Sequence, residues 1–108
     1  MNLDTSFNQF YQENGYAIIP DVIDSNLVEE VQNHVMWLQN KYPDIRPEAF
    51  HHDLLINDPF IHHLLGNKNM LDIIERVIGS GIALFGAHYI AKRPRDGKPV
   101  GWHQDGSY

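Results

Sequence analysis

The stretch IALFGAHYIAKRPRDGKPVGWHQD, residues 82–105, decides the fold of this chain. Its first part, residues 82–91, is rich in β-branched and aromatic side chains and carries no helix-capping signal, which is typical of a strand. Residues 93–99 contain two prolines and an Asp-Gly pair, the composition of a turn. Residues 100–105 resume an extended run. The stretch therefore predicts two strands joined by a short hairpin.

The residues before this stretch have mainly helical character. Apolar residues recur at helical spacing, and capping residues or glycines bound these runs. The predicted helix starts are near Phe7, at Asp24 or Ser25, at Asp58-Pro59, and at Asn67 or Asn69. The second helix has an apolar stripe made of Leu27, Val31, His34, Val35 and Leu38.

The segments between these helices are predicted from their composition. Tyr16–Ile19 has the pattern of a short buried strand that Pro20 stops. Residues 42–57, with two prolines and the pair His51-His52, are expected to form a loop. The order is helices with one early strand, followed by strands. This predicts an α+β fold in a single domain covering residues 1–108, in which the last strands have few partners within the chain.

Composition excludes several classes of protein. Of 108 residues, 43% are hydrophobic and 20% are charged, so the chain is expected to fold rather than remain disordered. No apolar run is long enough to cross a membrane, and the N-terminus lacks the pattern of a signal peptide. Cysteine is absent, which excludes disulfides and thiolate metal sites. A net charge of −6 argues against a nucleic-acid surface. We expect a cytoplasmic protein.

The His103-Gln104-Asp105 triplet is the main candidate for chemistry. In a strand, alternate side chains point to one face, so His103 and Asp105 are expected to point together while Gln104 points away. One imidazole nitrogen and one carboxylate oxygen, completed by a second histidine, make the facial triad that binds iron(II) and leaves open positions. Three residues alone are a weak signal, because a strand-end histidine beside a surface aspartate has the same pattern.

The surrounding sequence strengthens the metal hypothesis. The segment from Ala87 to Tyr108 resembles the phytanoyl-CoA dioxygenase family of iron(II)- and 2-oxoglutarate-dependent oxygenases. The shared features are a strand ending in Lys-x-Pro, a Gly-containing hairpin, and Trp-His-Gln-Asp followed by an aromatic residue. The opening Asn14-Gly15-Tyr16-Ala-Ile-Ile-Pro20 and its acidic helix also look like the start of that family. The resemblance implies the helical part and first strands of a double-stranded β-helix (a jelly-roll, cupin-like fold), incomplete in this chain.

The resemblance assigns roles to five residues. His103 and Asp105 match two of the three iron ligands, and His103, Gln104 and Asp105 are expected to border 2-oxoglutarate. His88 lies where the family often has a methionine against the cosubstrate. His51 falls near a basic residue that reaches it in some members. Because halogenating relatives replace the carboxylate with a small residue, Asp105 favours hydroxylation or another oxidative transformation, with dioxygen as cosubstrate, over halogenation.

The other histidines and the tryptophans have simpler interpretations. His34 is expected to pack at the edge of the core, and Trp37 and Trp102 to be packing residues. Adjacent helical side chains diverge by about 100°, so His62 and His63 are not expected to share a metal. His62 is expected to pair with Asp58 or to be solvated. The basic cluster Lys92, Arg93, Arg95 and Lys98 is expected to be a solvated hairpin, although a phosphorylated or acyl-CoA substrate would suit it.

Three functional hypotheses remain open at this point. The first is a hydroxylating dioxygenase of a small organic substrate, of which this chain supplies an N-terminal part that is inactive alone, because no residue matches the third ligand or the arginine that holds 2-oxoglutarate. The second is a metal- or ligand-binding module without turnover. The third is a structural fragment in which His-x-Asp is accidental.

Overall fold

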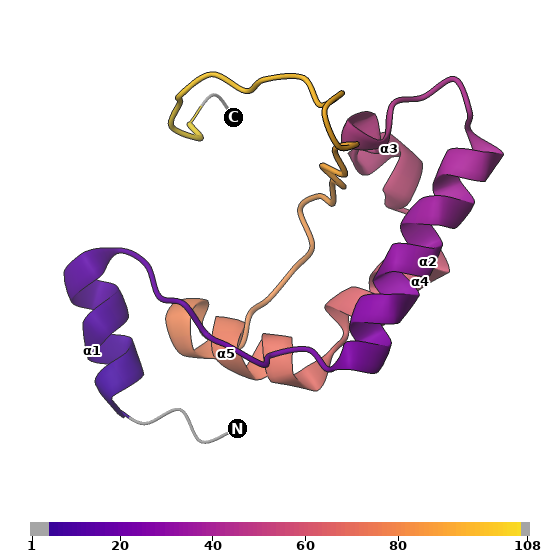
Figure 1. The fold of residues 1–108 in the computed structure, drawn as a ribbon. Coiled ribbons are helices and arrows are strands. Elements are labelled where there is room, and N and C mark those ends of the chain that lie inside the picture. Colours follow the sequence, from indigo (N-terminus) through magenta and orange to yellow (C-terminus); the bar gives the residue numbers. More distant parts are fainter. Residues whose placement is uncertain (1–4, 107–108) are drawn as a thin grey trace.

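The computed structural model describes residues 5–106, which form an open arc of helices followed by an extended segment (Figure 1). Helices α1 and α5 lie at one end of the arc, and α2, α4 and α3 form the other side. The extended C-terminal segment leaves α5, runs to α3 and then turns away. The helical elements are α1 Thr5–Asn14, α2 Ser25–Lys41, the 3-10 turn η1 Pro47–Ala49, α3 His52–Leu55, α4 Pro59–Leu65 and α5 Lys68–Ile78.

Helix α2 confirms the predicted cap and the predicted stripe. The Asp24 carboxylate accepts a hydrogen bond of 2.8 Å from the Leu27 backbone N–H, which satisfies one of the free donors of the first turn. Leu27, His34 and Leu38 are the buried residues of the helix. These three residues lie on one face of α2, and this face packs against the other helical elements.

The later helices also begin at capping residues. Asp58 accepts from the Phe60 N–H at 2.8 Å, with Pro59 in the first turn of α4. Of the two predicted starts for α5, Asn67 is correct, because its side chain accepts from the Met70 N–H at 3.2 Å. Gly79 ends α5 with φ 84°, a left-handed conformation in which a side chain would be strained.

The loop predicted for residues 42–57 is wrong in part, because it contains the turn η1 and the short helix α3. Such short helical elements carry no periodic pattern and owe their form to packing. The same segment supplies much of the core, in which Leu38, Phe50, Leu55 and Ile61 are nearly inaccessible to solvent. The core therefore lies between α2, α3 and α4, beneath the start of the extended segment.

The strand predicted at Tyr16–Ile19 is wrong for the structure, where Ile18 is 86% exposed and no ladder forms. Residues 82–91 and 100–105 are extended, but within residues 5–106 the only strand pairing is one bridge between Phe50 and Tyr89. The Tyr89 N–H donates to the Phe50 carbonyl at 2.8 Å. Extended backbone becomes a sheet only when a neighbouring strand supplies donors and acceptors along its length, and among the described residues Phe50 alone does so. The double-stranded β-helix stays a prediction.

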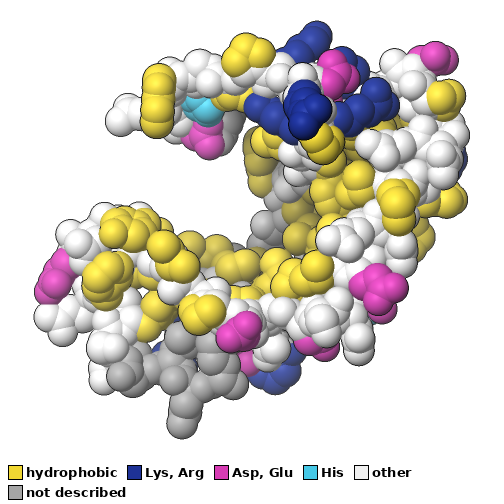
Figure 2. Space-filling view, viewed as in Figure 1, with side chains coloured by type: hydrophobic (Ala, Val, Ile, Leu, Met, Phe, Trp, Pro, Cys, Tyr) yellow, Lys and Arg dark blue, Asp and Glu magenta, His cyan; other side chains and the backbone are white. Residues whose placement is uncertain are grey.

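Apolar side chains line the inner side of the arc (Figure 2). Helix α5 is strongly amphipathic, yet none of its residues is buried. Its apolar residues Ile74, Val77 and Ile78 remain accessible beside Ile82 and Leu84. Over the described residues, no helix has both the length and the apolar character needed to cross a membrane.

Candidate metal-binding site

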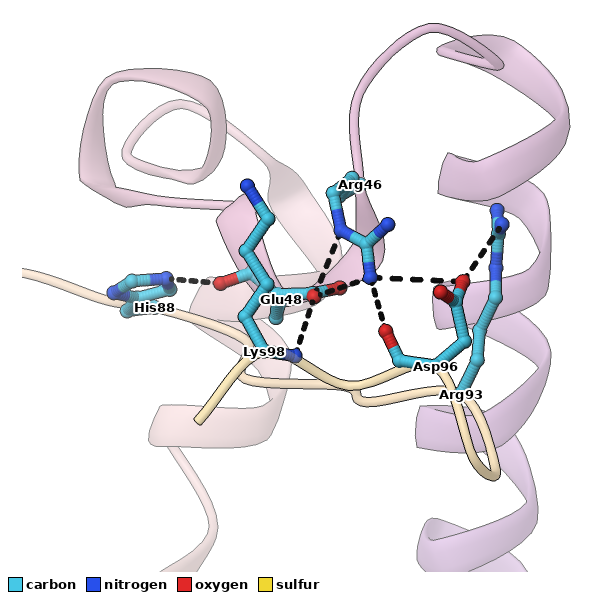
Figure 3. A network of polar contacts seen from close by, with 6 residues as sticks. All are labelled: Arg46, Glu48, His88, Arg93, Asp96 and Lys98. Atoms are coloured by element: carbon cyan, nitrogen blue, oxygen red, sulfur yellow. Dashed lines mark hydrogen bonds and ion pairs between the residues drawn. The ribbon is translucent and has the colours of Figure 1, made fainter. Parts of the chain in front are cut away.

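A cluster of charged residues fastens the hairpin turn to the helical layer (Figure 3). The Arg46 guanidinium bonds the Glu48 carboxylate through Nε at 2.9 Å and Nη2 at 2.8 Å. Nη2 of Arg46 also donates to the Asp96 carbonyl and lies 3.6 Å from its carboxylate. The Lys98 N–H lies 3.4 Å from Glu48 Oε1. Arg46 and Glu48 together therefore connect the segment before α3 with Asp96 and Lys98 of the turn.

Glu48 is the centre of this cluster. A hydrogen bond from its own backbone N–H, and next the one from Arg46, hold the pKa of the Glu48 carboxyl below its usual range. Its backbone carbonyl accepts from His88 Nε2 at 3.0 Å (Figure 3). The ring of His88 is therefore held against the helical layer.

The turn itself depends on a close approach between Gly97 and Lys92. A Cβ at position 97 would lie 2.9 Å from Cδ and 3.0 Å from Cβ of Lys92. Contact with Lys92 Cβ cannot be relieved by rotating the side chain, because that atom is fixed by the backbone. The glycine predicted to belong to the hairpin is therefore required by packing of the Lys92 stem across the turn.

Gly97→Ala is accordingly expected to lower the free energy of unfolding by about 1–3 kcal/mol, the usual cost of overpacking. Urea denaturation followed by circular dichroism measures it. Gly81→Ala is the matched control, because a Cβ there meets no atom within 4 Å. Equal stability of the two variants would show that the Lys92–Gly97 approach does not constrain the turn.

Beyond the turn, the chain brings His103 and Asp105 together. His103 Nε2 lies 3.2 Å from Asp105 Oδ1, as the alternation of side chains in an extended segment predicts. The other ring nitrogen, Nδ1, lies 2.8 Å from the Gly101 carbonyl. Because a carbonyl only accepts, Nδ1 carries the hydrogen in this contact. Gly101 thus fixes the ring so that Nε2 faces the carboxylate.

This arrangement requires a positive charge between the two side chains. With the hydrogen on Nδ1, a neutral His103 would direct the lone pair of Nε2 at a carboxylate oxygen, which is also an acceptor. A proton on Nε2 removes the conflict, and the hydrogen bond to Gly101, followed by the charge of Asp105, raises the pKa of His103. A metal ion in place of that proton would remove the conflict between the two acceptors equally well.

The spacing of the two donors fits a metal. Two ligands at right angles, each about 2.1 Å from a first-row metal ion, lie about 3 Å apart, close to the 3.2 Å between Nε2 and Oδ1. A backbone carbonyl holding the other nitrogen of a ligating histidine is the usual outer support of such sites. Both side chains remain accessible, at 58% and 74% exposure.

The remaining predicted site residues lie elsewhere. His51 precedes α3, is half exposed and has Nδ1 3.8 Å from Asp53, while His88 bonds to Glu48. Among residues 5–106, no group of three or more potential ligands is positioned to hold a metal. The packing role predicted for Trp102 is wrong, because its side chain is fully exposed. The aromatic residue that completes the quoted motif, Tyr108, lies outside the described residues.

Sequence reasoning missed a buried polar chain in the helical layer. His34, expected only to pack at the edge of the core, contacts Asp58 through Nε2 at 2.9 Å and the Tyr89 hydroxyl through Nδ1 at 3.1 Å. Of the two alternatives predicted for His62, pairing with Asp58 is wrong, and exposure to solvent is confirmed. His62 instead contacts the Ile56 carbonyl at 2.8 Å. The only signal in the sequence is a histidine on an apolar stripe, and this pattern does not indicate which residues the histidine contacts.

Tyr89 is expected to ionise later than ordinary tyrosines. Burial, and after it the charge of Asp58, raise the pKa of Tyr89 from 10.0 to about 12. The neutral phenol is therefore favoured by folding, and this contribution to stability is complete below pH 10 and lost as the pH rises toward about 12. Phenolate absorbance should show a step near pH 12 that Tyr89→Phe removes. A missing step near pH 10 in that variant would contradict the assignment.

A histidine and an aspartate two residues apart, facing one point after a hairpin, are typical of the class of non-haem iron proteins. Residues 11–108 match the family model of phytanoyl-CoA dioxygenase (PhyH), and the chain belongs to this family. The family lies within the Fe(II)- and 2-oxoglutarate-dependent dioxygenases, generally uses both cofactors and acts on small molecules. No curated protein and no solved structure matches the chain.

Proposed function

We propose that this chain carries the first two iron ligands, His103 and Asp105, of a 2-oxoglutarate-dependent dioxygenase that hydroxylates a small organic substrate. The observation that carries the proposal is the 3.2 Å contact between His103 Nε2 and Asp105 Oδ1, in which the Gly101 carbonyl holds Nδ1 and leaves Nε2 facing the carboxylate. Family membership supports it, because the matched residues 11–108 include both His103 and Asp105.

The protein side of this mechanism is derived from the residues around the pair. Bound iron(II) with 2-oxoglutarate would supply the oxidising chemistry. The Gly101 carbonyl keeps the hydrogen of His103 on Nδ1 and so presents the lone pair of Nε2. The Asp105 carboxylate would balance part of the metal's charge, and the metal would take the place of the proton that His103 Nε2 otherwise holds toward Asp105. We further propose that Gln104, His88 and His51 lie toward the cosubstrate.

The proposed fold gives the exposed apolar surface a role. Ile74 and Ile78 of α5 line one accessible apolar pocket together with Ile82 and Leu84 of the extended segment. In a double-stranded β-helix domain, further strands would pack against this surface and pair with residues 82–91 and 100–105. A sheet packed on a helical layer is a common way to bury such a face.

A second candidate function is a binding module without turnover. The observation in its favour is that only two donors converge among the described residues, and both are more than half exposed. Two donors bind a metal more weakly than three preorganised ones.

Anaerobic titration separates these functions. Binding of iron(II) is measured by quenching of the fluorescence of the exposed Trp102. If the dioxygenase proposal is correct, 2-oxoglutarate should tighten this binding, because the cosubstrate and the two side chains chelate one ion. Glutarate, which lacks the keto oxygen, is the matched control ligand. Tightening by both ligands, or by neither, would favour the binding module.

A further inference from the structure

Asp58, His34 and Tyr89 form a hydrogen-bonded chain that the proposed metal site does not use. The Asp58 carboxylate only accepts, so Nε2–H of His34 donates to it at 2.9 Å. Nδ1 of His34 is then left as an acceptor, and the Tyr89 hydroxyl donates to it at 3.1 Å. The Tyr89 phenol therefore donates to a base, the His34 imidazole, and this imidazole donates in turn to the Asp58 carboxylate.

The surrounding residues exclude solvent from His34 and keep the Tyr89 phenol neutral. The side chains of His34 and Asp58 are 8% and 13% exposed. The Phe60 ring lies 4.4 Å from the His34 ring, and Trp37 stacks on it at 5.7 Å. Burial raises the pKa of Tyr89 to about 12, so the hydroxyl does not lose its proton spontaneously near neutral pH.

We propose that Tyr89 is a redox-active tyrosine whose oxidation is coupled to proton transfer to His34. A strong one-electron oxidant takes one electron from the phenol, the O–H bond of Tyr89 breaks, and an N–H bond forms at Nδ1 of His34. The products are a neutral tyrosyl radical, an imidazolium stabilised by Asp58, and the oxidant reduced by one electron. A one-electron reductant such as ascorbate reverses the step, and the proton returns to the phenol oxygen.

Trp37 supplies a path for the electron to the surface. Its ring is 49% exposed and stacks on His34, and Lys41 Nζ lies 4.6 Å above it. The lysine cation disfavours a positive charge on the oxidised indole, whereas Tyr89 becomes neutral once its proton has moved. Oxidation that begins at Trp37 therefore ends at Tyr89. Tyr89 would thereby protect other residues of the chain from one-electron oxidation. This role does not rest on the proposed metal site.

Flash photolysis with ruthenium(III) tris-bipyridine as oxidant, without iron, tests the proposal on the full chain. A tyrosyl radical detected by its absorbance and electron paramagnetic resonance should form in a fast phase that Tyr89→Phe abolishes. Tyr16→Phe, at an exposed tyrosine, is the matched control and should keep it. A fast phase that survives in Tyr89→Phe would overturn the assignment.

His34→Gln separates a base from a structural partner. The amide can donate to Asp58 and accept from Tyr89, but it cannot take up a proton, so radical formation should slow by about 10²-fold, as when a positioned base is lost. Equal rates in this variant and the wild type would overturn the proposal. A measurement on the wild type needs no substitution: deuterated solvent should slow the fast phase, and the absence of an isotope effect would also overturn it.

Discussion

His103→Ala is expected to weaken binding of iron(II) to this chain by at least about tenfold, since removing even a residue that only supports a ligand costs 10–100-fold in metal affinity. The variant removes the Nε2 donor and leaves Asp105 as a single exposed carboxylate. Anaerobic titration followed by Trp102 fluorescence measures the change. Asp105→Ala should give a loss of similar size, because the account treats the two side chains as one site.

His63→Ala is the matched control for this experiment. His63 Nε2 lies 3.2 Å from a Glu30 carboxylate oxygen, the same separation as in the His103–Asp105 pair. The side chains of His63 and Glu30 are also exposed. Within residues 5–106, no backbone carbonyl holds the other ring nitrogen of His63, so its ring is not oriented in the same way. If His63→Ala weakens iron binding as much as His103→Ala, the chain has only nonspecific histidine–carboxylate sites.

Asp58→Ala is expected to lower the free energy of unfolding by about 2–4 kcal/mol. One part, about 1 kcal/mol, is loss of the cap on α4, where Asp58 accepts from Phe60 N–H. The larger part, about 1–3 kcal/mol, comes from leaving the buried His34 N–H without its acceptor. Urea denaturation measures the change. Both roles are combined in one carboxylate, so this is the largest stability effect expected from a single truncation at a polar residue.

Asp24→Ala provides the control for the cap. Asp24 caps α2 through the Leu27 N–H in the same way, but the structure gives it no buried histidine partner. Its loss should cost only about 1 kcal/mol. Equal losses in the two variants would mean that the His34–Asp58 contact contributes nothing to stability.

The helical half of the fold was predictable because its signals are local. Asp24, Asp58 and Asn67 are capping residues followed by apolar spacing, and each caps a helix in the structure. Backbone donors at a helix start must be satisfied nearby, so the sequence itself holds the information. The alternation that brought His103 and Asp105 together is local in the same sense.

Features that depend on distant contacts were not predictable. The Tyr16–Ile19 segment has strand composition, but no strand pairs with it among the described residues. The chain from Asp58 through His34 to Tyr89 joins residues 24 and 55 positions apart, and no spacing rule connects them. Trp102 was assigned to packing by residue type alone, and the structure exposes it.

The central claim is that one metal ion binds between His103 and Asp105. Nuclear magnetic resonance of the imidazole signals of all seven histidines, during titration with iron(II), tests it directly. If the ion binds there, the His103 signals should broaden first, and Asp105→Ala should remove this preference. Simultaneous broadening of His51, His62, His63 and His103, unchanged in Asp105→Ala, would contradict the claim.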